Sequence, residues 1–324
     1  MIKICGTGSA LPARRVTNSD LSKIIDTSDE WISSRTGIRA RHLAVEETTT
    51  GMSVQAAQAA LREAGLAPEK LDLIIAATLS PDHILPTLAC EVQAAIGAVG
   101  AVAFDLHAAC SGFLFSMNTA AAYMGSGIYK NALIIGAETL SRMIDWSDRG
   151  TCVLFGDGAG AAVLRALPED GTGGGLKAFV QYSDGVRGNV LACANRPVCH
   201  PFAVHGAENQ YVTMDGQAVY KFAVSTVPRV VAEVVEKAGL SLADIDHFVL
   251  HQANRRIIES VAKRLKQPME KFHMNLQECG NISAASVPVL LDFLNKNGMI
   301  RPNERIVLAG FGGGLTWGAA VIQW

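Results

Sequence analysis

Charge is scarce in this 324-residue chain, and neither sign is in excess. Only 18% of the residues are charged, and 28 basic side chains nearly balance 30 acidic ones, which gives a net charge of −2. Without a basic excess or an acidic tail, the sequence does not indicate a nucleic-acid-binding protein. Hydrophobic residues make up 49% of the chain. That share excludes disorder and predicts a large core in one or two domains.

The seven cysteines form no CxxC pair and suggest no disulfide framework. Cys193, Cys199, His200 and His205 lie close in sequence, but the five-residue gap between the two thiols does not match the spacing of zinc ligands. We therefore expect no metal. Residues 1–6 are predicted to form a strand and lack the basic and apolar regions of a signal peptide, so we expect a cytoplasmic protein in a reducing compartment.

Several common nucleotide-binding and catalytic motifs are also absent. Gly6-Thr7-Gly8 follows a predicted strand, but the third glycine and the downstream acidic residue of a dinucleotide-binding loop are missing. The glycine-rich segment 171–175 is not followed by the Lys-Ser/Thr pair of a phosphate-binding loop. No G-x-S-x-G elbow occurs, so a serine hydrolase is not supported.

Residues 106–129 carry no formal charge and are long enough to cross a membrane. A helix that is apolar on every side lies either in lipid or in the middle of a large protein. The stretch contains five Ser, Asn or Thr residues and three glycines. This polar content favours a helix in the centre of the fold, and we expect no membrane association.

The chain contains an internal repeat. Ala64-Gly65-Leu66 and Ala238-Gly239-Leu240 each precede a charged linker and an apolar run, at an offset of 174 residues (238 − 64 = 174). A strand-like segment further along each half shares that offset, and a third match follows in the same order. Such matches indicate a duplicated unit. We expect an N-terminal half over 1–170 and a C-terminal half over 171–324, joined at the glycine-rich segment 171–175.

Each half is predicted to run helix, strand, helix, strand, strand. In the first half the pattern predicts a helix over 53–64, a strand over 72–79, a helix from about 111, and strands over 132–137 and 153–164. Strands that alternate with helices predict parallel sheets covered on both faces. Packing the halves together would bury the helices that begin near 110 and 283, which explains the uncharged stretch.

Cys110 stands between a predicted strand over 101–106 and the uncharged helix. The free N–H groups and the positive dipole end of a helix N-terminus favour a thiolate, and small neighbouring residues leave room for an acyl group. Free cysteine is also among the most buried residue types. These residues alone therefore support a nucleophile and a core thiol equally.

The second half supplies polar partners for a thiolate. His251 ends an apolar strand, and Asn281 precedes the second buried helix. Because matching halves bring their strand ends together, Cys110, His251 and Asn281 are predicted to line one pocket. Glycines 312–314 offer amides that can stabilise an oxyanion. A lone histidine at a strand end is more often structural, so the residues alone leave that alternative open.

Motifs along nearly the whole chain resemble those of the β-ketoacyl-[acyl-carrier-protein] synthase III family, the priming condensing enzymes of bacterial type II fatty acid synthesis. The segments that carry the resemblance are residues 6–9, 27–32, 35–39, 148–150, 155–160, 251–254, 280–286 and 311–314. The resemblance implies a homodimer with the thiolase-like fold. This α/β fold has duplicated βαβαβαββ halves in a five-layer αβαβα arrangement.

The same resemblance implies the roles of individual residues. Cys110 is the acylated nucleophile, His251 and Asn281 complete the catalytic set, and the amides of Cys110 and Gly313 form the oxyanion hole. The residues implied to bind coenzyme A are Trp31, Arg149, Thr27, Arg35 and Asn254. The implied carrier-protein-binding residues are Gln252, Ala253, Asn254, Arg255, Arg256, Lys263 and Arg264. Leu85, where acetyl-specific members often have Phe, is implied to close the primer pocket across the dimer interface.

The implied reaction is a decarboxylating Claisen condensation of an acyl-CoA primer with malonyl-[acyl-carrier-protein], through an acyl-Cys110 intermediate and with His251 neutral. The coenzyme A thioester is a substrate, so no cofactor is expected. One alternative is a related Cys-dependent acyltransferase or condensing enzyme of secondary metabolism. A second is a non-catalytic acyl-binding module, against which the intact Cys-His-Asn set argues. His107 departs from the family pattern, and the sequence does not place its side chain.

Overall fold

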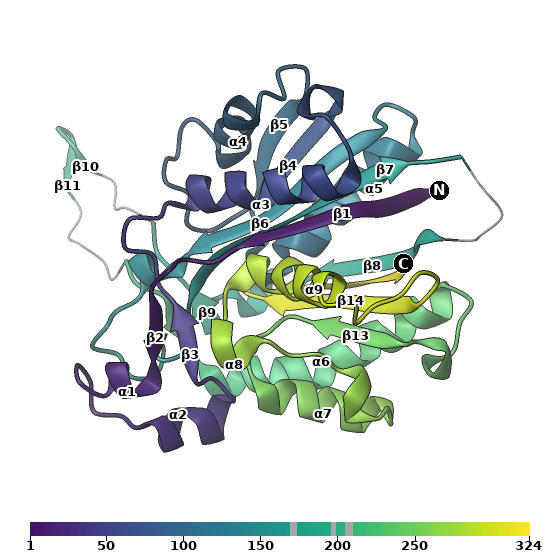
Figure 1. Ribbon diagram of the computed structural model, residues 1–324. Helices are drawn as coiled ribbons and strands as arrows, with labels where there is room; N and C mark the ends of the chain where they lie inside the picture. The colour runs from purple at the N-terminus through teal and green to yellow at the C-terminus, as the bar shows by residue number, and fades with distance from the viewer. Residues whose placement is uncertain (169–173, 196–198, 205–209) are drawn as a thin grey trace.

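Two large β-sheets, with helices on both faces of each, form the centre of the protein (Figure 1). The structure, a computed structural model, describes residues 1–168, 174–195, 199–204 and 210–324. Helices α3 (Thr49–Ala64) and α4 (Leu88–Ile96) cover the outer face of the first sheet, and α6 (Gly216–Lys237) and α7 (Arg255–Leu265) lie on the outer side of the second. Helices α5 and α9 lie between the sheets. The predicted five-layer αβαβα arrangement is therefore confirmed.

The first sheet has five strands in the order β1-β7-β6-β4-β5. They are β1 (Ile2–Ala10), β4 (Leu73–Ala77), β5 (Val102–Leu106), β6 (Asn131–Thr139) and β7 (Asp157–Ala166). β4 pairs in parallel with β5 and β6, whereas β7 runs antiparallel to both β6 and β1. β5 is thus an edge strand of this sheet.

The second sheet has the strand order β13-β14-β15-β8. Its strands are β8 (Gly175–Ser183), β13 (His247–Leu250), β14 (Arg305–Gly312) and β15 (Thr316–Gln323). β13 and β14 are parallel, and the other two pairs are antiparallel. Phe272 forms an isolated parallel bridge with Phe248 beside β13, where a fifth strand of this half would lie.

The predicted parallel pairing holds for β4 with β5 and β6 and for β13 with β14, but both sheets are mixed. A parallel neighbour needs a long crossover connection, usually a helix. β14 and β15 are joined instead by a short turn, and residues 140–156 between β6 and β7, all of them described, contain no α-helix. The last two strands of each half therefore pair antiparallel. The residue pattern revealed these strands but not their direction.

Caps explain where the helices begin. The apolar periodicity predicted a helix from residue 53, but α3 begins at Thr49 because the Thr48 side chain accepts a hydrogen bond from the N–H of Gly51 (2.9 Å). Gly65 ends the helix with a φ of 57°, a conformation that favours glycine. The strand β7 also begins later than predicted, at 157 instead of 153, because residues 151–154 form a turn.

The backbone confirms the repeat at an unusual turn. The 3-10 helix η2 (Ala109–Ser111) precedes α5 (Gly112–Gly125), and η7 (Ser283–Ala285) precedes α9 (Ser286–Lys296). Ala109 and Ser283 are 174 residues apart (283 − 109 = 174), with φ values of 45° and 46°. Positive φ is uncommon outside glycine, so its recurrence marks one duplicated turn. In the second copy Ala284 occupies the position of Cys110.

The uncharged stretch is a core helix. Phe113, Leu114 and Met117 of α5 are buried in one cluster with Leu290 of α9 and strand residues of both sheets. None of the described helices combines the length and hydropathy that a bilayer crossing requires.

Most of the remaining elements gather at one end of the two sheets, and the strands β10 and β11 project away from them (Figure 1). They are β2 (Arg15–Thr17), α1 (Asn18–Leu21), α2 (Asp29–Thr36), β3 (Ala40–His42), β9 (Leu191–Ala192), β10 (Cys199–His200), β11 (Ala203–Val204), β12 (Thr213–Met214) and α8 (Leu276–Cys279). β7 ends in the first sheet at Ala166, and β8 begins in the second at Gly175. Most of the predicted joint 171–175 lies outside the described residues.

Candidate active site

A cavity of about 160 Å³ lies where residues of both halves meet. Cys110 of η2, His251 directly after β13, and Asn281 from the loop after α8 all line it. The structure therefore brings together the three residues that were predicted to share a pocket. The rest of the lining is mainly apolar and includes Leu154, Phe155, Leu191, Met214, Val219, Tyr220, Ile257 and Phe311.

Cys110 lies in the tight turn that leads from β5 into α5. The turn is held by Ser111, whose Oγ donates to the carbonyl of Thr316 on β15 (3.0 Å). On the other side of the thiol, a Cβ at Gly312 would lie 2.7 Å from the Cys110 Cβ and 2.9 Å from its Sγ. Only glycine leaves room for such an approach. The sulfur is thus fixed against the end of β14.

Burial controls the ionisation of Cys110. The residue is only 6% exposed, and desolvation raises the pKa of its thiol to about 11, with the Glu138 carboxylate as a further raising influence. Hydrogen bonds from the Ser283 hydroxyl and from the N–H groups of Cys110 and Gly313 lower the pKa, but they do not compensate. Loss of water therefore outweighs the helix terminus, which by itself would favour a thiolate.

The same interactions describe an anion site beside the sulfur. The backbone N–H groups of Cys110 and Gly313 both stabilise negative charge on Sγ. Two amides that converge beside a nucleophile have the arrangement of an oxyanion hole. The two amides predicted from the sequence thus lie together at the thiol.

His251 is a neutral hydrogen-bond donor. Its Nδ1 lies 2.7 Å from the Oγ of Ser286, and that oxygen accepts the N–H of Gln252 (3.4 Å). We assign the tautomer in which Ser286 donates its hydroxyl hydrogen to Nδ1 and the ring hydrogen lies on Nε2. Burial lowers the pKa of His251 to about 3, so the ring is neutral, as expected. Phe311 packs edge-on against it at a centroid distance of 5.1 Å.

The orientation of Asn281 follows from its backbone contacts. Its Oδ1 accepts the N–H of Ser283 (2.9 Å), so Nδ2 is left to donate into the cavity. The main chain of Asn281 is clamped as well, because it accepts the N–H of Gly156 (3.0 Å) and donates to the carbonyl of Leu154 (2.9 Å). The cavity therefore holds a thiol, two neutral N–H donors and two backbone amides.

Comparisons with known proteins agree with this geometry. Residues 104–185 match the family model described as 3-Oxoacyl-[acyl-carrier-protein (ACP)] synthase III, and residues 235–324 match the model of its C-terminal part. The β-ketoacyl-[acyl-carrier-protein] synthase III of Clostridium acetobutylicum is 49% identical over 324 residues, which span 100% of this chain and 98% of the relative. The chain belongs to the β-ketoacyl-[acyl-carrier-protein] synthase III family.

Solved structures of synthases III have the same fold. The enzyme of Aquifex aeolicus VF5 superposes with a TM-score of 0.94 at 45% identity and covers 100% of both chains. The priming β-ketosynthase of the R1128 polyketide pathway gives a TM-score of 0.93 at 34% identity and covers 100% of this chain and 96% of its own. The protein is an acyl-transferring condensing enzyme with a thiolase-like fold. The identity is higher to synthases III than to the polyketide enzyme, so the comparisons favour a priming synthase III over the alternative of an enzyme of secondary metabolism.

In this synthase III chain, Trp31 of α2 is flanked by two cations. The guanidinium carbon of Arg35 lies 4.6 Å from the Trp31 ring centroid, and that of Arg149 lies 4.8 Å from it. Asn254 connects this group to the cavity lining, because its Nδ2 donates to the carbonyl of Arg35 (3.2 Å). The Oγ1 of Thr27 is buried without a hydrogen-bond partner among the described residues. Four of the five residues expected to bind coenzyme A, namely Trp31, Arg35, Arg149 and Asn254, thus form one group that reaches the cavity lining at Asn254.

A basic surface lies on α7, directly beyond the cavity. Ile257, Ile258 and Val261 bury one face of the helix. Its opposite side exposes Arg255, Arg256, Lys263 and Arg264, and Lys266 follows at the helix end. We call these five residues the α7 basic surface. Arg255 is engaged by Glu259 (2.6 Å), whereas Arg256 forms no ion pair within the described part of the chain.

Gln252 does not belong to that surface, which corrects one sequence-based expectation. The residue is 0% exposed. Its Nε2 donates to the carbonyl of Leu250 (2.8 Å), and its Oε1 accepts the N–H of Asn275 (3.2 Å). Gln252 therefore supports the loop beside His251 and cannot contact a docked protein. From the sequence alone, a polar residue after a strand could either support the loop or face a docked protein.

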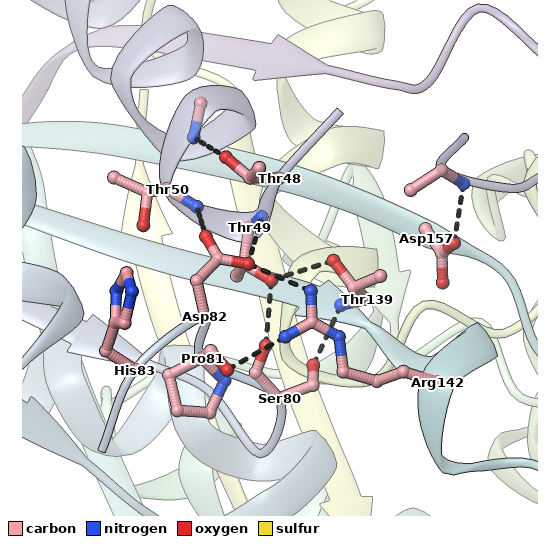
Figure 2. A network of polar contacts seen from close by, with 12 residues as sticks. Thr48, Thr49, Thr50, Ser80, Pro81, Asp82, His83, Thr139, Arg142 and Asp157 are labelled. Atoms are coloured by element: carbon pink, nitrogen blue, oxygen red, sulfur yellow. Dashed lines mark hydrogen bonds and ion pairs between the residues drawn. The ribbon is translucent and has the colours of Figure 1, made fainter. Parts of the chain in front are cut away.

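Leu85 is 82% exposed and does not line the cavity of its own chain. Its loop is nevertheless fixed, as Figure 2 shows. Asp82 accepts the backbone N–H groups of Thr49 (3.2 Å) and Thr50 (2.7 Å) at the start of α3, and Arg142 donates to Asp82 (2.9 Å). Leu85 is thus presented outward from a rigid base. His107 is also exposed and does not line the cavity.

The described residues contain no group of three or more His, Cys, Asp or Glu side chains that could hold a metal ion. Cys193 is exposed, and His205 lies outside the described residues.

Sequence reasoning missed three functional neighbours of the catalytic set. Ser286 orients His251, Ser283 orients Asn281, and Glu138 acts on the Cys110 thiol. The two serines lie inside a segment that carried the family resemblance, so their positions were visible although their contacts were not. The signal for Glu138 was an acid at the end of an otherwise apolar strand.

Proposed function

We propose that this synthase III condenses an acyl-CoA primer with malonyl-[acyl-carrier-protein] through an acyl-Cys110 intermediate. The supporting observation is the convergence in one apolar cavity of the thiol with the N–H donors of His251, Asn281 and two backbone amides. Each donor lies where the reaction develops negative charge, and preorganised donors act most strongly in a dry site.

Acylation is the first half-reaction. The Cys110 sulfur attacks the thioester carbonyl, and its oxygen takes up negative charge between the N–H groups of Cys110 and Gly313. Collapse of this tetrahedral species expels coenzyme A and leaves the acyl group on Cys110. We propose that Trp31 and Arg149 hold the adenine end of the substrate and that Thr27, Arg35 and Asn254 line its path.

Condensation is the second half-reaction. Malonyl-[acyl-carrier-protein] loses CO2, and the enolate oxygen accepts hydrogen bonds from Nε2 of His251 and Nδ2 of Asn281. Neutral donors suit this step because they stabilise the anionic transition state more than the uncharged thioester oxygen of the ground state. The enolate carbon then attacks the acyl-Cys110 carbonyl, and the Cys110 thiolate is expelled. The proton that Cys110 loses on acylation returns to the sulfur when condensation expels the thiolate, so the cycle needs no metal or redox cofactor. The free nucleophilic thiol suits a reducing cytoplasm.

The experiment that tests this function mixes purified protein with acetyl-CoA and malonyl-[acyl-carrier-protein]. We expect β-ketoacyl-[acyl-carrier-protein], CO2 and coenzyme A in equal amounts, with the acyl group on Cys110 detected by mass spectrometry of the protein before the second substrate is added. Release of coenzyme A without a new carbon–carbon bond would show a different acyl transfer.

We propose that the α7 basic surface docks the acidic carrier protein. Ala253 and Asn254 line the cavity, and α7, which carries the five cations, begins directly after Asn254. Complementary charge steers such encounters and weakens with salt.

Reversing the charge of Arg256 tests this docking. Arg256→Glu should raise KM for malonyl-[acyl-carrier-protein] roughly tenfold, which corresponds to about 1.4 kcal/mol of lost attraction, and should leave self-acylation from acetyl-CoA unchanged. The measurement is steady-state kinetics at low and high salt. Lys70→Glu is the matched control, because Lys70 is also exposed but lies just before β4 in the N-terminal half and does not belong to the α7 basic surface. Equal losses in both half-reactions would remove the carrier-specific role.

We propose that the protein is a homodimer that pairs through β5. This edge strand of the first sheet exposes Val102 (48%), and the nearby Ile84 and Leu85 are 75% and 82% exposed. An uncovered apolar edge is a site for pairing with another chain. A second copy related by a two-fold axis would cover it and bring Leu85 to the partner's primer pocket. We also propose that residues 1–170 and 171–324 are the two repeated halves of each chain.

Leu85→Phe tests the primer pocket. Because Leu is smaller than Phe, the wild type should accept isobutyryl- and hexanoyl-CoA as well as acetyl-CoA, and Phe should shift kcat/KM toward acetyl-CoA. Each buried methylene contributes about 0.8 kcal/mol, which is a few-fold per carbon. Sedimentation should give twice the mass of one chain for both proteins. Ile84→Phe on the same loop is the matched control, and an unchanged ratio in Leu85→Phe would refute this role.

A further inference from the structure

The end of β6 carries a buried acid that no step above uses. Glu138 is 0% exposed. Its Oε2 accepts hydrogen bonds from the N–H of Leu79 (3.0 Å) and the hydroxyl of Ser80 (2.7 Å). Ser80 is itself fixed, because its Oγ accepts the N–H of Thr139 (2.8 Å; Figure 2). Oε1, in contrast, has no well-aligned hydrogen bond to any described residue.

Glu138 lies near the nucleophile, with Ser283 between them. The turn η7 packs tightly on β6, because a Cβ at Gly136 would overlap the carbonyl of Ala284. Because η7 also contacts η2, Ser283 lies beside the turn of the nucleophile as well, and its hydroxyl lowers the pKa of both the Cys110 thiol and the Glu138 carboxyl. Within the described residues, neither the buried Ser283 hydroxyl nor Glu138 Oε1 has a hydrogen-bond partner in the resting structure, so both atoms are available for new links. A thiol, a hydroxyl and a carboxylate therefore lie in one buried cluster.

The acylation step needs a group that accepts the Cys110 proton. The resting sulfur is a thiol, because burial raises its pKa to about 11. His251 is poorly placed for this task, since Ser286 already donates to its Nδ1 and its Nε2 carries the ring hydrogen. A neutral imidazole with both nitrogens so engaged is a donor toward the cavity, not a base.

We propose that Glu138 accepts the Cys110 proton through the Ser283 hydroxyl during acylation and returns it when condensation expels the thiolate. This proposal rests on the proposed condensation. In the forward step the thiol proton moves to Ser283 Oγ as the hydroxyl proton moves to Glu138 Oε1. Coenzyme A leaves as a thiolate and takes its proton from water. After condensation, the Cys110 thiolate regains the stored proton by the reverse route.

The charge balance of the buried pair supports this relay. Moving a proton from Cys110 to Glu138 creates no additional buried charge, whereas releasing it to solvent would leave two anions facing each other. Stored on Glu138, the proton also keeps the acyl-enzyme neutral when the anionic malonyl group enters. Burial raises the pKa of Glu138 to about 7, although the hydrogen bonds from Ser80 and Leu79 lower it. The carboxyl can therefore change protonation near neutral pH.

Other charged groups around Glu138 are already engaged. On the adjacent β7, Asp157 accepts the N–H groups of Ala44 and Ser141 (2.8 and 2.9 Å). Asp82 after β4 is paired with Arg142. The elements β4, α5 and η7, which pack against β6 and are described throughout, contain no Asp, Glu, Lys, Arg or His. Cys110 of η2 is thus the titratable neighbour with which Glu138 exchanges a proton.

The test measures single-turnover acylation by acetyl-CoA as a function of pH, with mass spectrometry of the intact protein. The wild-type rate should rise toward a plateau above about pH 7. In Glu138→Gln the rate at pH 7 should fall about 10²-fold, a typical effect of losing a general base, and should keep rising with pH as the thiol ionises unaided. Acylation should also produce an infrared band of a protonated carboxyl group that Glu138→Gln lacks.

Two further variants distinguish the proposed proton relay from a purely structural role of Glu138. Ser283→Ala keeps the carboxyl but removes the relay atom, and it should show the same loss of the plateau even if Glu138→Gln fails to fold. Asp157→Asn removes another buried acid and should keep the wild-type pH profile. If the wild type is acylated but both relay variants keep its plateau, the relay is refuted. If no acyl-CoA acylates the wild type, the proposed function fails instead.

Discussion

His251→Ala or Asn281→Ala should keep self-acylation of Cys110 and lose decarboxylation of malonyl-[acyl-carrier-protein] by about 10²–10³-fold for each donor removed. Neither side chain touches the two amides that stabilise the acylation oxyanion. Both lie in the cavity with one N–H directed inward, since Ser286 and Ser283 hold their opposite ends. Removing one leaves the enolate oxygen with a single side-chain donor in a mainly apolar cavity.

The measurement follows the two half-reactions separately, by mass shift of the protein with acetyl-CoA and by release of CO2 from the malonyl substrate. Cys110→Ala is the complementary control, because it should abolish acylation while both donors stay in place. The pKa of His251 is lowered to about 3 by burial. His251 should therefore contribute no inflection to the decarboxylation rate between pH 5 and 8. Wild-type decarboxylation in both donor variants would overturn the division of roles.

Much of the fold followed from the internal repeat in the sequence. The 174-residue offset placed Cys110 opposite Ala284, and the backbone repeats its rare positive φ at Ala109 and Ser283. Strand direction did not follow, because an apolar run such as that of β7 has the same composition in either direction. Helix starts were displaced where a cap decided them, as Thr48 does for α3.

The site was predicted less completely, because its chemistry depends on solvation. A cysteine before a helix suggested a thiolate, yet the depth at which Cys110 lies reverses that expectation. Gln252 was predicted to bind the carrier protein, but its side-chain amide forms hydrogen bonds with backbone groups inside the protein. Glu138 lies 28 residues from Cys110 in sequence (138 − 110 = 28) and meets it only through packing of the second half against β6. These properties arise from tertiary contacts that no local pattern contains.

The close approach of β14 to the nucleophile provides a second test with a large expected effect. Gly312→Ala should reduce the acylation rate by about 10²-fold, because the new Cβ would lie 2.7 Å from the Cys110 Cβ and 2.9 Å from Sγ. Contacts that short do not persist, so the thiol or the end of β14 must move. Either shift separates Sγ from the N–H of Gly313. The backbone of Gly312 does not require a positive φ, so the effect arises from contact with the nucleophile.

Gly125→Ala is the matched control for this substitution. Gly125 is the last residue of α5, and a Cβ there would meet no other atom within 4 Å. Alanine favours a helix over glycine by about 0.5–1 kcal/mol, so this variant should be as stable as the wild type or more stable, with unchanged acylation. Overpacking a core typically costs about 1–3 kcal/mol, so thermal unfolding must be recorded with the kinetics. If folded Gly312→Ala acylates at the wild-type rate, the position of the thiol against β14 does not determine its reactivity.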